Sequence, residues 1–172
     1  MDIKQIITSQ YLASLAMLKQ VIADCPPAMW DNPDDQNRFW HVAYHALFYT
    51  HFYLHPSENE FEPWSKNRRD YQFMGPTPWP PHAKPQLDQP YTRADLLEYV
   101  EVCQAQVVKW VAATDLSAAE SGFHWLPFGK LELQIYSMRH LQQHIGELCD
   151  RLGERAGLEI DWVGIGPAAS AG

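Results

Sequence analysis

The 172-residue sequence contains few cysteines, and they are not paired. Cys25, Cys103 and Cys149 lie far apart along the chain, and no CxxC motif is present. Disulfide-stapled folds and cysteine zinc sites rely on numerous or closely spaced cysteines. We therefore expect three reduced thiols in a cytoplasmic protein and no metal site built from cysteine.

Basic residues are scarce as well. Thirteen Lys and Arg stand against 21 Asp and Glu, the formal net charge is −8, and the longest basic run is KNRR at 66–69. Proteins that bind nucleic acid or anionic lipid surfaces usually present a basic stripe to the phosphates. The composition argues against nucleic acid and against a membrane as partners.

The N-terminal stretch lacks a long uninterrupted apolar block. Its first twenty residues, MDIKQIITSQYLASLAMLKQ, place a polar residue every few positions and offer no small-residue cleavage site after an apolar run. A secretory signal or a membrane span would need such a block. We expect neither here. A repeat period and the alternating pattern of half-buried strands are also missing from the chain.

The sequence does contain four segments with apolar residues at the spacing of amphipathic helices. The second of them is apolar on nearly every face, so we expect it to be central to the core. These segments are residues 3–22, about 34–55, 92–115 and 131–156. They predict an all-α fold, a four-helix bundle forming one domain over residues 1–156, with a mobile tail at 157–172.

Several local signals mark where these helices begin and end. The CPP at 25–27 ends the first helix, and the DNPDD at 31–35 offers caps and first-turn carboxylates to the second. Thr92 and Asp95 have the spacing of a capping box at the start of the third helix.

A proline-rich and aromatic-rich segment separates the second and third helices. Residues 56–90 hold eight of the thirteen prolines, and five large aromatic residues lie among them. The prolines exclude a long helix, whereas the aromatics argue against a free linker. We expect an ordered crossover packed over one end of the domain, in the manner of a lid over a functional site.

Histidines are concentrated on two of the predicted helices. The run FWHVAYHALFYTHFYLH at 39–55 carries four of the eight, and His41 and His45 in it are four residues apart. His140 and His144 on the last helix repeat that spacing. Two imidazoles one helical turn apart can reach a single metal ion. The other four histidines, His51, His55, His82 and His124, are expected to be solvent-exposed or capping residues.

The ligand chemistry narrows the kind of metal site. Neutral nitrogens suit zinc or nickel, and three histidines with an open fourth position suit catalysis better than a purely structural role. A di-iron carboxylate site would need a Glu on the second helix, which has none. Covalent haem would need CxxCH, which is absent. The sequence leaves open the possibility of a non-covalent haem held by two histidines.

The motifs FWHVAYHALFYTHFYL and RHLQQHIGEL resemble those of the DinB/YfiT-like superfamily of metal-binding four-helix bundles. This superfamily includes the DNA-damage-inducible DinB proteins and thiol-dependent S-transferases, and the similarity covers residues 1–156. The resemblance implies that His140 and His144 are metal ligands. Its first-ligand pattern fits VAYHAL best, which implies His45, while FWHVAY leaves His41 as the alternative.

The resemblance also implies a function. We expect a divalent metal ion, zinc or nickel, in a metal-dependent transferase or hydrolase that acts on a small-molecule substrate or a low-molecular-weight thiol. Members are often dimeric, which implies a homodimer. The alternative is a non-enzymatic, stress-response bundle with a structural or sensing metal. Glu147, three residues after His144, could support the site, although a solvated helix-face carboxylate is the preferred interpretation.

Overall fold

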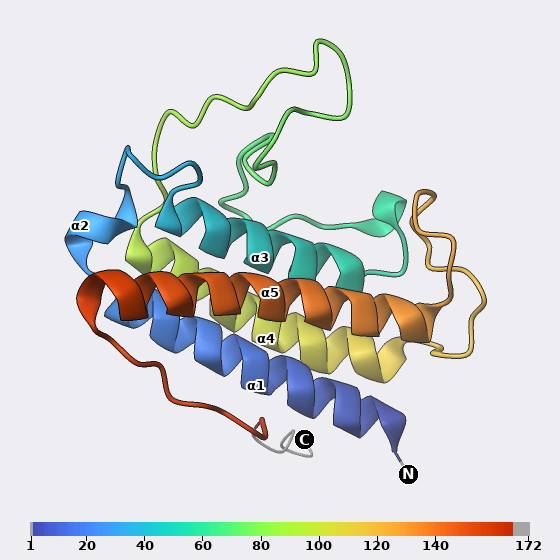
Figure 1. Cartoon of the computed structure of the whole chain (residues 1–172). Coiled ribbons are helices and arrows are strands. Elements are labelled where there is room, and N and C mark those ends of the chain that lie inside the picture. Colours follow the sequence, from blue (N-terminus) through green and yellow to red (C-terminus); the bar gives the residue numbers. More distant parts are fainter. Residues whose placement is uncertain (1, 167–172) are drawn as a thin grey trace.

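The computed structural model describes residues 2–166, which form five α-helices, one short 3-10 helix and no strand (Figure 1). The predicted all-α class is confirmed. The elements are α1 (Ile3–Asp24), α2 (Pro27–Trp30), α3 (Phe39–Leu54), η1 (Glu58–Glu60), α4 (Arg93–Ala113) and α5 (Lys130–Ala156).

The four long helices pack side by side. α1 and α3 each pack against both α4 and α5. As Figure 1 shows, α3 and α4 run in one direction while α1 and α5 run in the other. Two helices that run the same way need a connection that returns along their length, about 24 Å for a 16-residue helix such as α3. The long segment between α3 and α4 provides that return.

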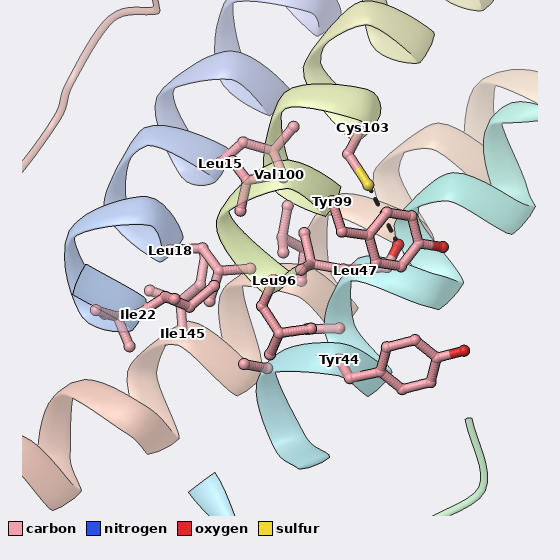
Figure 2. Packing of buried hydrophobic residues seen from close by; sticks show 14 of the residues in the cluster. Leu15, Leu18, Ile22, Tyr44, Leu47, Leu96, Tyr99, Val100, Cys103 and Ile145 are labelled. Atoms are coloured by element: carbon pink, nitrogen blue, oxygen red, sulfur yellow. Dashed lines mark hydrogen bonds between the residues drawn. The ribbon is translucent and has the colours of Figure 1, made fainter. Parts of the chain in front are cut away.

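The core is formed where the apolar stripes of these helices meet. Figure 2 shows α1 and α4 side chains interdigitating, with Ile145 of α5 and Leu47 of α3 closing the cluster. Leu18 and Leu96 within it are completely buried. By length and composition α1 is the one helix in residues 2–166 that could cross a membrane, yet it packs against α4 and α5 here.

Three of the predicted helix ends are present. α1 ends at Asp24, directly before the CPP, and the Thr92–Asp95 capping box opens α4. α5 ends with Gly157 at a φ of +65°, the left-handed conformation that glycine adopts without strain. The sequence did not predict α2, a single turn that begins at Pro27.

The predicted start of α3 was wrong. The helix begins at Phe39, and its N-cap residue Arg38 makes no side-chain cap. Asp31, expected to cap the helix, instead accepts hydrogen bonds from the side chains of Arg38 and Trp40. Asp35 accepts one from Arg155 of α5. These carboxylates tie the loop before α3 to other side chains.

The crossover between α3 and α4 is held by buried aromatic rings. It lies over α3 on the side away from α1 (Figure 1). Trp64 stacks on Tyr99 of α4 at a centroid distance of 4.4 Å, and Tyr91 stacks on Tyr44 of α3 at 4.6 Å. All four rings are at least nine-tenths buried. The aromatics therefore anchor the crossover to the helices, despite its prolines.

Residues 158–166, after α5, run back along α1. Gly166 N–H donates to the carbonyl of Ser9, and Asp161 N–H donates to the side chain of Gln20. The remainder of the tail predicted to be mobile, residues 167–172, lies outside the described residues.

Candidate metal centre

Three histidines from two helices converge at the contact between α3 and α5. His45 comes from the middle of α3, and His140 and His144 lie one turn apart on α5. His45 Nε2 is 3.0 Å from His140 Nε2, which in turn is 3.2 Å from His144 Nε2. One ligand atom from each of the three lies within 4.8 Å of the others. This is a group that could hold a metal ion.

Hydrogen bonds at the far side of two rings fix their tautomers. His45 Nδ1–H donates to the carbonyl of Gln72 at 2.6 Å, and His144 Nδ1–H donates to the Glu147 carboxylate at 3.2 Å. Both acceptors carry no proton of their own, so the proton sits on Nδ1 in each neutral ring. The Nε2 atoms of both rings therefore present lone pairs to the centre of the group. Such outer hydrogen bonds commonly orient metal-bound histidines.

His140 faces both of these lone pairs. Its Nδ1 is buried and has no hydrogen-bond partner among residues 2–166. If Nε2 carries the proton, it can donate to His45 or to His144 but not to both, so one lone pair stays unsatisfied in a buried place. A cation at the centre would satisfy all three nitrogens. Tetrahedral zinc with bonds of about 2.0–2.1 Å places its nitrogens about 3.3 Å apart, close to the 3.0 and 3.2 Å from His140 Nε2 to its two neighbours.

Burial keeps two of the three rings uncharged. Desolvation lowers the pKa of His45 to about 3 and that of His140 to about 4, with the neighbouring histidines adding to the effect. Both rings are therefore neutral at pH 7. Neutral imidazole is the form that binds a metal, so no proton has to leave these two rings at that pH.

A charged network supports His144 from behind. One oxygen of Glu147 accepts from His144, and the other accepts from Arg151. Arg151 also donates to the carbonyl of Asn37 at 2.8 Å and lies 3.9 Å from Asp35. Glu147, expected as a solvated helix-face carboxylate, is one-third exposed and also bonds His144 and Arg151.

His41, the alternative first ligand, is not in the group. It is one turn before His45 and 3% exposed, and its Nε2–H donates to the carbonyl of Tyr71 at 2.8 Å. Its ring packs beside Trp40. The structure thus brings His45, His140 and His144 together, and it joins His41 to the crossover.

The expectation of exposure was wrong for His51 and His55. Both are 2% exposed, because Phe61 of the crossover packs against both rings at 5.2 and 5.1 Å. His51 is hydrogen-bonded to the Tyr99 hydroxyl, whereas His55 is the C-cap residue of α3, as the capping interpretation allowed. The remaining two, His82 and His124, are exposed loop residues as expected.

An aromatic cavity of about 790 Å³ is lined by two residues that contact the histidines, although none of the three histidines lines it. Tyr49 lines it, and the Tyr49 ring is 4.8 Å from that of His45 and 5.5 Å from that of His140. Gln72, whose carbonyl holds His45, also lines it. Sequence reasoning did not single out the cavity, although the aromatics of the crossover were a signal for it.

The chain was compared with models of known families, with curated proteins and with solved structures, and none of them matches. The resemblance to DinB-like proteins is therefore neither supported nor opposed by these comparisons. Function has to be inferred from the side chains of the site.

Proposed function

We propose that the protein binds one divalent metal ion, zinc or nickel, through His45, His140 and His144, in a four-helix bundle of the DinB-like kind. We further propose that it is a metal-dependent transferase or hydrolase acting on a small molecule in the cytoplasm. The observation that carries the proposal is the convergence of three imidazole nitrogens, of which two have their protons fixed on the opposite side of the ring.

The number of ligands favours catalysis over a structural role. Among residues 2–166 the group has three members, and structural zinc sites normally use four protein ligands. A fourth position would be left for water or a substrate atom. When bound there, a divalent ion lowers the pKa of water or of a thiol and so supplies a nucleophile at neutral pH.

The surrounding residues have separate tasks in this proposal. Glu147 holds the proton of His144 on Nδ1, and the carbonyl of Gln72 does the same for His45. Burial raises the pKa of Tyr49 to about 12, so its phenol keeps its proton and can donate a hydrogen bond. Because Tyr49 lines the cavity and packs on His45, it can orient a molecule beside the three histidines.

Elemental analysis of protein purified without a histidine tag tests the proposal. We expect close to one zinc or nickel per chain, and loss of that metal in His45→Ala and His144→Ala. His41→Gln and His82→Gln are matched controls, because His41 bonds Tyr71 and His82 lies in an exposed loop. Circular dichroism of each variant checks that it is folded. A metal-free parent protein after incubation with zinc and with nickel would contradict the proposal, as would metal retained by folded His45→Ala.

A further inference from the structure

We infer that the aromatic cavity near the histidines binds an arylalkylamine, a planar apolar ring joined through a short alkyl chain to a protonated amino group. This inference rests on the proposed function in one respect only: it takes the three histidines to be the reactive centre that this cavity serves. It names the substrate class of that centre, which the ligands themselves leave open.

The walls of the cavity are suited to an aromatic ring. Three parts of the chain contribute aromatic side chains to them: α3, the crossover that contains η1, and the loop before α5. Phe52 and Trp125 lie nearly parallel, at 11° and 6.1 Å, and Phe73 meets Trp79 edge to face at 5.2 Å. Pairs of this kind offer both faces and edges to a further ring.

The charge of the cavity favours a cation. Glu58 is its one carboxylate, and no Lys or Arg is among its lining residues. One Glu58 oxygen, Oε1, is 2.9 Å from His124 Nδ1, whereas Oε2 has no hydrogen-bond partner among residues 2–166. The electron-rich faces of aromatic rings attract cations, and a carboxylate adds a charge-assisted hydrogen bond. An ammonium group next to Glu58 would use both.

The ammonium group of Lys130, which lies near Phe123, is taken up by backbone carbonyls. Lys130 is buried at the start of α5, and its ammonium group donates to the carbonyls of Pro56 and Ser121. Glu60 and Glu62 follow Glu58 in the sequence but do not line the cavity. A ligand with carboxylates would meet negative charge at Glu58 without a compensating Lys or Arg. The cavity therefore disfavours carboxylate-bearing thiols as its occupant.

Binding of three small probes of nearly the same shape tests the inference. They are 2-phenylethylamine, 2-phenylethanol and phenylacetate, which are a cation, a neutral molecule and an anion. Isothermal calorimetry on the metal-loaded protein should show that the amine binds most tightly, the alcohol less tightly and the acid least. Glu58→Gln should lose about tenfold in affinity for the amine, the effect of one charge-assisted hydrogen bond. Affinity for the alcohol should stay unchanged in Glu58→Gln.

Two variants serve as controls. Glu60→Gln makes the same change of charge in η1, but Glu60 is not a lining residue, so amine binding should stay within twofold of the parent. Trp79→Leu removes one aromatic wall and should weaken all three probes. The inference is overturned if phenylacetate binds as tightly as the amine, if Glu58→Gln weakens all three equally, or if no probe binds.

The outcome is separable from the test of the metal. His144→Ala lies outside the lining of the cavity, so it should lose metal yet keep the preference for the amine. Selective amine binding without any metal in the parent would contradict the proposed function and leave the cavity assignment standing. Metal binding without selectivity among the probes would contradict the cavity assignment and leave the proposed function standing.

Discussion

His45 and His140 are 95 positions apart in the sequence, and their Nε2 atoms lie 3.0 Å from each other. Packing of α3 against α5 creates this contact, and hydrogen bonds on the far sides of His45 and His144 turn lone pairs toward the same point. Neutral, buried nitrogens held this close repel one another unless a proton or a cation lies between them. If the proposed metal binds there, it should remove this repulsion and stabilise the fold.

Removing the Glu147 side chain should weaken metal binding without abolishing it. Glu147→Ala leaves His144 Nδ1 without its acceptor, and losses of about 10–100-fold in metal affinity are typical for such outer partners. Competition with a chromophoric chelator measures the affinity. Glu154→Ala, on the exposed face of the same helix, is the matched control and should bind the metal as tightly as the parent does. Equal affinities in the two variants would contradict a supporting role for Glu147.

The metal-free protein should lose stability as pH falls from about 6.5. Burial lowers the folded-state pKa of His45 to about 3, of His140 to about 4 and of His51 to about 3, all below the usual 6.5 of an unfolded chain. Between these values the unfolded state binds more protons than the folded one, so stability rises with pH across this window. The limiting slope is about 1.4 kcal/mol per pH unit for each histidine.

Urea unfolding of metal-free protein at pH 7.5, 6.0 and 5.0 checks this prediction. His51→Gln removes one buried imidazole away from the metal group and should flatten the slope, even if its stability at pH 7.5 is lower. His124→Gln changes an exposed loop histidine and should keep the parent slope. A parent whose stability is the same at pH 7.5 and 5.0 would contradict the burial of neutral histidines.

Two glycine substitutions should act in opposite directions. Gly122 has a φ of +86°, and a Cβ there would be 2.0 Å from the carbonyl oxygen of Pro56. We expect Gly122→Ala to destabilise the fold by about 1–3 kcal/mol or more. Gly146, inside α5, has no atom within 4 Å of such a Cβ, so Gly146→Ala should stabilise the protein by about 0.5–1 kcal/mol. Chemical denaturation measures both, and destabilisation by Gly146→Ala would argue against its open surroundings.

Adding metal should raise the unfolding temperature of the parent but not of His45→Ala. A ligand that binds only the folded state stabilises it by about 2.7 kcal/mol at a concentration one hundred times its dissociation constant. Differential scanning fluorimetry with and without zinc gives the shift. His41→Gln should show the same rise in unfolding temperature with zinc as the parent. Equal shifts in the parent and in His45→Ala would place the metal elsewhere.

The local features of the sequence predicted the helices well, because each depends on neighbours a few residues away. The spacing of apolar residues identified four long helices, and Thr92 with Asp95 identified the start of α4. The spacing of His140 and His144 placed both on one side of α5 in the same way. The choice of His45 over His41 was a prediction from a family pattern, and the structure brings His45 to the α5 pair.

Features that depend on distant contacts were not predictable in this way. The start of α3 depends on Asp31 and Asp35 meeting side chains of Trp40 and Arg155 rather than helix N–H groups. The burial of His51 depends on Phe61 folding back from the crossover. Arg151, which bonds Glu147 on the same helix, also donates to the carbonyl of Asn37, 114 positions away in the sequence. None of these contacts leaves a periodic signal in the sequence.

X-ray absorption spectroscopy of the zinc-loaded protein tests the central claim most directly, because it counts the atoms bound to the metal. The account predicts three imidazole nitrogens at about 2.0–2.1 Å and no sulfur in the parent, and no protein-bound zinc in folded His45→Ala. Sulfur at about 2.3 Å, or an unchanged spectrum in His45→Ala, would contradict a metal centre formed by His45, His140 and His144.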